Sequence, residues 1–152
     1  MSQNQSNSFA QLVERFEQIR QQMVEEGTAV MKFEFQKVFE TYPEITVIKW
    51  TQYTPYFNDG DECVFGVNDF TVSNAPDPNE VDAYGEYEGD EEGIWAIDTG
   101  WGEGKKKYPV INALNDFAQT KIGEEVFRGT FGDHSIVTVT RDGIDVEEYE
   151  HD

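Results

Sequence analysis

The sequence predicts an α+β fold, in which a long helix, an antiparallel sheet and a further helix occupy separate stretches of one chain. Three observations predict it. Apolar residues recur with a helical period over residues 9–42. Two Asp-Gly pairs, at 59–60 and 142–143, each separate stretches rich in strand-forming residues, a pattern typical of β-hairpins. A second helical pattern covers residues 109–122.

One domain is expected from the length of 152 residues. We expect residues 1–7 to be a disordered lead and residues 8–152 to form the single α+β domain, with a long acidic loop at 74–93. The sheet should have about five strands, made of two hairpins and one further strand.

The N-terminal helix has clear signals at both ends. Ser8 is a suitable N-cap with Gln11 three residues later, and Tyr42 precedes a proline, which disfavours further helix. Gly27 allows a break, but the apolar phase continues through it and favours one helix. We expect the apolar stripe to face the core, with a homodimer seam as the open alternative.

Residues 45–72 are expected to form a long hairpin with its turn at Asp59-Gly60. Folding about this turn pairs Thr54 with Phe65. Because side chains alternate between faces, Ile48 and Trp50 should lie on one face. The other face should carry Val47, Phe70 and Val72.

The segment WTQYTPYFNDGDECVF within this hairpin resembles small uncharacterised bacterial and phage proteins. The resemblance implies a recurrent domain and carries no known activity.

The stretch after the acidic loop should contain one strand, a glycine-rich turn and a helix. Residues 94–98 should form the single strand, and TGWGEG a glycine-rich turn that leaves Lys105–Lys107 at the start of a helix. That helix should begin near Pro109 and stop at Gly123. Residues 124–133 fit either a short helix or an irregular segment.

The chain should end in a second hairpin with Asp142-Gly143 as its turn. Its register would pair Val139 with Val146 and Val137 with Glu148.

Charge is distributed very unevenly. The net charge is −20, and no basic residue occurs between Lys49 and Lys105, where 14 carboxylates lie. Such a chain is unsuited to binding a phosphate backbone directly and should be attracted to basic partners.

We therefore expect a non-enzymatic, acidic binding protein that occupies a basic surface of a partner protein, including a phage-type inhibitor that mimics nucleic acid. Its carboxylates would stand in for phosphates, and its aromatic side chains would act as anchors. The expected binding residues are Asp82, Tyr84, Glu86, Tyr87, Glu88, Asp90, Glu91 and Glu92.

Two other interpretations stay open. The acidic stretch can be a solvated surface with no partner. Alternatively, the chain is a small-ligand or nucleotide-binding domain with an aromatic cleft formed by Trp50, Tyr56, Trp95 and Trp101.

No catalytic residue, metal site or cofactor is predicted. Residues 58–62 are rich in oxygen ligands but lack the spacing of a calcium-binding loop, and residues 100–105 lack the phosphate-loop pattern. Cys63 is the only cysteine, which excludes an intramolecular disulfide and suits a reducing compartment. With no signal-like or membrane-length apolar run, we expect a cytoplasmic protein.

Overall fold

The computed structural model describes residues 8–57 and 59–150, so the predicted disordered lead lies outside the described residues. The helices are α1 (Phe9–Thr41), the 3-10 helix η1 (Pro78–Glu80), α2 (Gly102–Lys107), α3 (Pro109–Ala118) and α4 (Lys121–Phe131). The strands are β1 (Val47–Tyr53), β2 (Gly66–Val67), β3 (Thr71–Ser73), β4 (Ala96–Asp98), β5 (Ser135–Thr140) and β6 (Gly143–Glu148). The predicted α+β class is confirmed.

All strand pairs in the described sheet are antiparallel. The sheet has the order β4-β3-β1-β5-β6, with β2 pairing the other end of β1. β1 is therefore central, and the C-terminal hairpin β5–β6 completes one side of the sheet.

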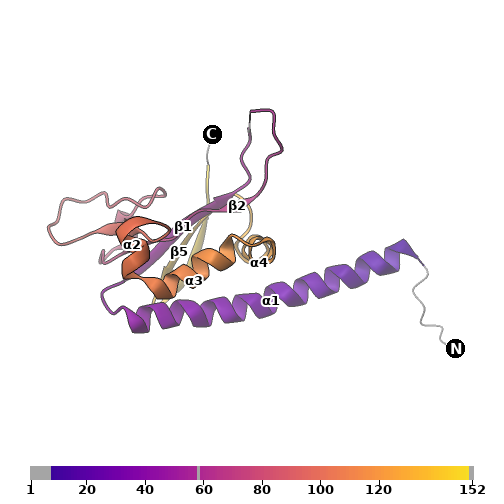
Figure 1. Ribbon diagram of the computed structural model, residues 1–152, viewed down its shortest axis with the longest axis horizontal. Helices are drawn as coiled ribbons and strands as arrows, with labels where there is room; N and C mark the ends of the chain where they lie inside the picture. The colour runs from indigo at the N-terminus through magenta and orange to yellow at the C-terminus, as the bar shows by residue number, and fades with distance from the viewer. Residues whose placement is uncertain (1–7, 58, 151–152) are drawn as a thin grey trace.

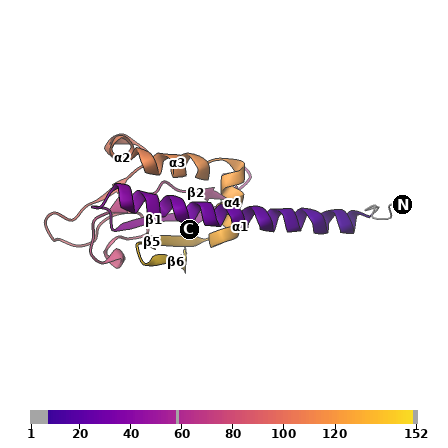
Figure 2. The same ribbon diagram turned by 90° about the horizontal axis from the view of Figure 1, so that it is seen from below.

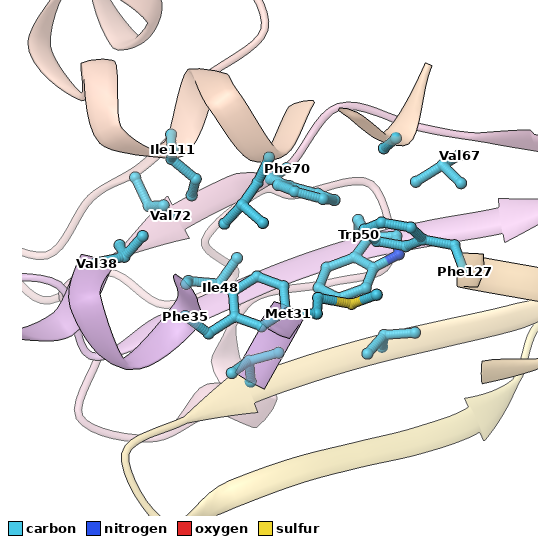
Figure 3. Packing of buried hydrophobic residues seen from close by; sticks show 14 of the residues in the cluster. Met31, Phe35, Val38, Ile48, Trp50, Val67, Phe70, Val72, Ile111 and Phe127 are labelled. Atoms are coloured by element: carbon cyan, nitrogen blue, oxygen red, sulfur yellow. The ribbon is translucent and has the colours of Figure 1, made fainter. Parts of the chain in front are cut away.

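Helices α1, α3 and α4 cover one face of the sheet (Figures 1 and 2). Trp50 of β1 lies at the centre of the core between them, with its ring 4.6 Å from that of Phe70 and 5.6 Å from that of Phe35 (Figure 3). Phe127 of α4 and Ile111 of α3 are also fully buried in this cluster. Aromatic packing of this kind gives a small domain a large buried apolar area.

Helix α1 continues through Gly27, as predicted, and the Ser8 hydroxyl caps it by accepting a hydrogen bond from the Gln11 amide. Only its C-terminal part faces the core, where Met31, Phe35, Val38 and Phe39 are buried. The N-terminal part extends beyond the rest of the domain (Figures 1 and 2). The expectation of a core-facing stripe is therefore right for only half of the helix.

A bulge in the first hairpin changes which residues share a face. Gln52 pairs with Val67, as the predicted register requires. Lys49 pairs with Thr71 and not with Phe70, so the register is shifted there by one residue. The extra residue lies between Asn68 and Thr71, so Val72 stands opposite Ile48. The prediction that Phe70 and Val72 share a face with Val47 is wrong for this reason.

The first hairpin is also shorter than predicted. Its β1–β2 ladder ends at the Tyr53–Gly66 pair, so Thr54 and Phe65 are not paired in it. The Thr54 amide donates instead to a carboxylate oxygen of Asp133 at 2.8 Å, and Pro55 has no N–H to donate.

Helix α3 ends at Ala118, earlier than predicted, because Thr120 begins a new helix. The Thr120 hydroxyl accepts a hydrogen bond from the Gly123 amide at 2.9 Å, an N-cap interaction. Gly123 is thus in the first turn of α4 rather than a helix stop, and a Cβ there would collide with the Phe117 carbonyl oxygen.

Two turn predictions are also wrong. The predicted glycine-rich turn contains the start of α2, and Lys105–Lys107 lie in the last turn of that helix, where cations are favourable.

In the second hairpin Thr140 pairs with Gly143, so Arg141 and Asp142 form the turn. The register shifts by two residues, to Val137–Val146, which leaves the faces unchanged.

Candidate functional site

The acidic loop 74–93 has an internal structure of its own. Val81 forms an isolated bridge with Tyr87, and the Asp82 amide donates to the Glu86 carbonyl at 2.8 Å. The Asp82 carboxylate accepts hydrogen bonds from the amides of Tyr84 and Glu86, which closes the turn. Residues 80–88 therefore make a small irregular hairpin rather than an open connection.

A second, smaller core holds this loop against the sheet. Val81 and Ala75 are buried together with Val47 of β1, and Ile94 and Ala96 pack around them. Val47 alternates with Ile48, which belongs to the main core, so the small core lies on the sheet face opposite the helices. The acidic loop is thus the cover of that face.

Lys49 is the central residue of the same face. Its side chain is only 8% exposed, and its Nζ atom donates a hydrogen bond to the Val81 carbonyl oxygen at 2.6 Å. Burial lowers the pKa of Lys49, while four surrounding carboxylates oppose that shift. These four, which we call the acidic face, are Asp82, Glu88, Asp145 and Glu147.

The acidic face combines two segments far apart in the sequence. Asp82 and Glu88 come from the loop, whereas Asp145 and Glu147 come from β6, which lies beyond β5 at the edge of the sheet. Lys49 pairs with Thr138, and Thr138 pairs with Asp145 on the next strand. The side chains of these three residues therefore point to the same face of the sheet. Sequence reasoning missed Asp145 and Glu147, since the order of strands was not predictable from the sequence.

The structure distributes the predicted binding residues over two places. Asp82 and Glu88 belong to the acidic face, and Tyr87 is half-buried, with its hydroxyl accepting a hydrogen bond from the Glu91 amide. The others are exposed to solvent around the loop: Tyr84, Glu86, Asp90, Glu91 and Glu92.

The predicted aromatic cleft is not formed. Trp50 is 2% exposed and lies inside the main core, while the ring of Trp95 stacks on that of Tyr108 at 6.3 Å. The ring of Tyr56 stacks on that of His134, and Trp101 is exposed elsewhere. The prediction fails because Trp50 points to the helix side of the sheet.

A pair of carboxylates lies at the other edge of the sheet. Partial burial and the nearby Asp98 carboxylate raise the pKa of Asp69. Asp98 also accepts a hydrogen bond from the Gly100 amide at 2.7 Å. Among the described residues, no group of three or more His, Cys, Asp or Glu side chains is placed to hold a metal ion.

Several hollows border helix α1, and two of them are the most relevant here. One, of about 660 Å³, runs between α1 and the α3–α4 pair and is lined by apolar side chains that include Met23, Val30, Phe117 and Ile122. The other, of about 740 Å³, lies between the C-terminal part of α1 and the β5–β6 turn, next to Phe39 and Arg141.

Comparison with protein-family models, with curated proteins and with solved structures gave no significant match for this chain. Within residues 8–57 and 59–150, no helix combines the length and the apolar character needed to cross a membrane.

Proposed function

We propose that this chain is a non-enzymatic binding protein whose acidic face and acidic loop dock onto a basic surface of another protein. One observation carries the proposal. The loop and β6 converge on Lys49 from two sides of β1, so that carboxylates from distant parts of the chain share one surface.

Lys49 offers no exposed cation at that surface. Its Nζ atom is directed to the Val81 carbonyl and is buried, whereas Glu88, Asp145 and Glu147 are exposed. Gathering exposed like charges destabilises a compact protein by self-repulsion, and a cationic partner relieves that cost. A basic partner would also be steered to this face during encounter.

The same surface favours one class of partner. Carboxylates from two segments, with the exposed ring of Tyr84 beside them, suit a basic groove that normally holds nucleic acid. In that role the carboxylates take the place of phosphates, and Tyr84 enters a pocket of the partner as an anchor.

The test uses a fluorescent Lys/Arg-rich peptide of about 20 residues and a neutral peptide of equal length, measured by anisotropy over a salt series. Binding of the basic peptide should weaken as salt screens the exposed charges. Five exposed acids of the loop are neutralised together in one variant: Glu86→Gln, Glu88→Gln, Asp90→Asn, Glu91→Gln and Glu92→Gln. A control variant has the same change in net charge on helices α1 and α4: Glu14→Gln, Glu25→Gln, Glu40→Gln, Glu124→Gln and Glu125→Gln.

We expect the loop variant to lose at least tenfold in affinity and the control to lose much less. Equal losses in the two variants would mean that only net charge matters, and the proposed docking surface would be wrong. A second measurement tests the partner class, by adding the protein to preformed complexes of basic DNA-binding proteins with labelled duplex DNA. Release of the duplex supports nucleic-acid mimicry, and retention of the duplex with every protein tried contradicts it.

A further inference from the structure

Helix α1 carries a second apolar stripe that the domain leaves largely exposed, although Met23 within it is partly buried against the main core. Successive residues of this stripe are alternately three and four positions apart, which is the seven-residue repeat typical of a coiled-coil seam. They are Phe9, Leu12, Phe16, Ile19, Met23, Val30 and Phe33, with Glu26 as the one polar member of the series. We call this set the seam.

The seam lies on a different side of α1 from the core residues. At 3.6 residues per turn, Val30 is about a quarter to a third of a turn away from Met31, which is buried. Phe9, Phe16 and Phe33 are 86%, 60% and 64% exposed. The seam is therefore open to solvent along both the protruding and the domain-bound parts of the helix.

A groove follows the seam where α1 meets the domain. It is the hollow of about 660 Å³, with Ile19, Met23 and Val30 on the α1 side and Phe117 and Ile122 on the other. A helix laid along the seam would have these two side chains as a lateral wall. The domain-bound part of α1 therefore forms an apolar groove suited to binding an amphipathic helix.

We propose that the occupant is α1 of a second copy of this chain, paired antiparallel so that the middle of each helix, around Ile19 and Val30, lies along the groove of the other copy. Placing Ile19 opposite Val30 of the second copy also places Phe16 opposite Phe33 of the second copy. The arrangement is isologous, since both contacts occur twice. It is independent of the acidic face.

Charge selects the antiparallel orientation. In that arrangement Arg20 of each copy lies beside Glu34 of the other copy, giving two pairs of opposite charge along one flank of the seam. A parallel arrangement would instead place Glu26 against Glu26 of the second copy and Arg15 against Arg20. Like charges at these positions disfavour it.

The available area also fits a dimer. An aromatic side chain buries about 150–250 Å², so the exposed parts of the three seam phenylalanines offer roughly 300–500 Å² per copy. A stable interface needs about 800 Å² per partner. The aliphatic seam residues and the exposed Ile122 supply further apolar area toward that value.

The experiment measures the mass of the full chain by light scattering and by sedimentation over about 1–100 μM. We expect a species of twice the 17.4 kDa chain mass. The double variant Phe16→Glu/Ile19→Glu should be monomeric and keep its fold, because both side chains are exposed in the single chain. The matched control Gln18→Glu/Gln21→Glu adds the same charge to the opposite side of the same helix and should remain dimeric.

Orientation is tested in two ways. Arg20→Glu and Glu34→Arg should each weaken the dimer, and the double variant should restore it. Pyrene attached to Gln11→Cys in a Cys63→Ser chain should give no excimer emission, because the two labels lie at opposite ends of an antiparallel pair. A wild-type monomer at 100 μM, or a dimer that survives Phe16→Glu/Ile19→Glu, would overturn the proposal, and strong excimer emission would overturn the orientation.

Discussion

The Nζ atom of Lys49 lies 2.6 Å from the carbonyl oxygen of Val81, to which it donates a hydrogen bond. Lys49 belongs to the central strand, and Val81 is, with Ala75, one of the two buried residues of the acidic loop. This bond joins the loop to the sheet beneath the acidic face. The behaviour of the loop and of Lys49 should therefore be coupled.

Lys49→Met should remove one pH dependence of stability. Burial lowers the pKa of Lys49, so the unfolded chain binds its proton more tightly, with a pKa of about 10.4. Just below that pH the unfolded state holds more protons, and the free energy of unfolding should rise as pH increases. Urea unfolding at pH 8–10 should show this rise in the wild type and a smaller one in Lys49→Met. If the free energy of unfolding changed with pH in the same way in both proteins, Lys49 would not be the cause of the change. Tyr108, whose pKa is raised by burial, titrates in both proteins and contributes equally to each.

Asp69→Asn should stabilise the protein at neutral pH. Partial burial and the Asp98 carboxylate raise the pKa of Asp69, so the folded state holds its proton to a higher pH than the unfolded chain does. Stability from this group is present below about pH 3.9 and is lost as pH rises through the higher folded pKa. Thermal unfolding at pH 4 and pH 7 should show the gain of Asp69→Asn at pH 7 only. A gain of equal size at both values would rule out repulsion as its cause.

Gly27→Ala should destabilise the fold, although replacing a mid-helix glycine by alanine ordinarily favours a helix. A Cβ at Gly27 would lie 2.7 Å from Cγ1 of Val126, a fully buried side chain of α4. Overpacking costs about 1–3 kcal/mol, against about 1 kcal/mol gained in helix propensity. Denaturant unfolding of Gly27→Ala, Val126→Ala and the double variant should show that the second change offsets part of the first. If the double variant lost the sum of the free energies of unfolding that the two single variants lose, a clash between the new Cβ and Val126 would be excluded.

Proteolysis of the acidic loop should be local. A long acidic loop without buried groups would be cut throughout its length, but Val81 and Ala75 are buried and residues 80–88 are bonded to one another. A glutamate-specific protease should therefore cut after Glu91 or Glu92 well before Glu80. Tyr87→Phe removes the acceptor of the Glu91 amide and should speed that cut, whereas Tyr84→Phe should not. Equal rates at Glu80 and Glu91 would show that the loop is mobile throughout.

Much of the fold was predictable because its signals are local. The cap at Ser8 and the unbroken apolar phase predict α1, and the Asp-Gly pair at 59–60 predicts the register of Gln52 with Val67. The pairing of β1 with β5 joins residues some 90 positions apart in the sequence, and no local pattern specifies it. That pairing is what brings Asp145 and Glu147 to Lys49.

The candidate site was only partly predictable for the same reason. The acidic loop was found because charge composition is visible in the sequence. The aromatic cleft was wrong because both faces of the first hairpin are half apolar, so the sequence does not say which face the helices cover. Only the structure shows that Trp50 points to the helices and Lys49 to the acidic face.

The bulge between Asn68 and Thr71 makes this short stretch sensitive to changes in chain length. The one extra residue places the side chains of Phe70 and Val72 on the same face of the sheet as those of Ile48 and Trp50. Deleting one residue there would restore an even ladder and exchange the two faces of β3, which would turn Phe70 toward the carboxylates and Thr71 into the core. An evolving chain could lengthen the exposed tip at residues 59–62 without moving a core side chain, but deleting one codon a few residues later would exchange the buried and the exposed faces of β3.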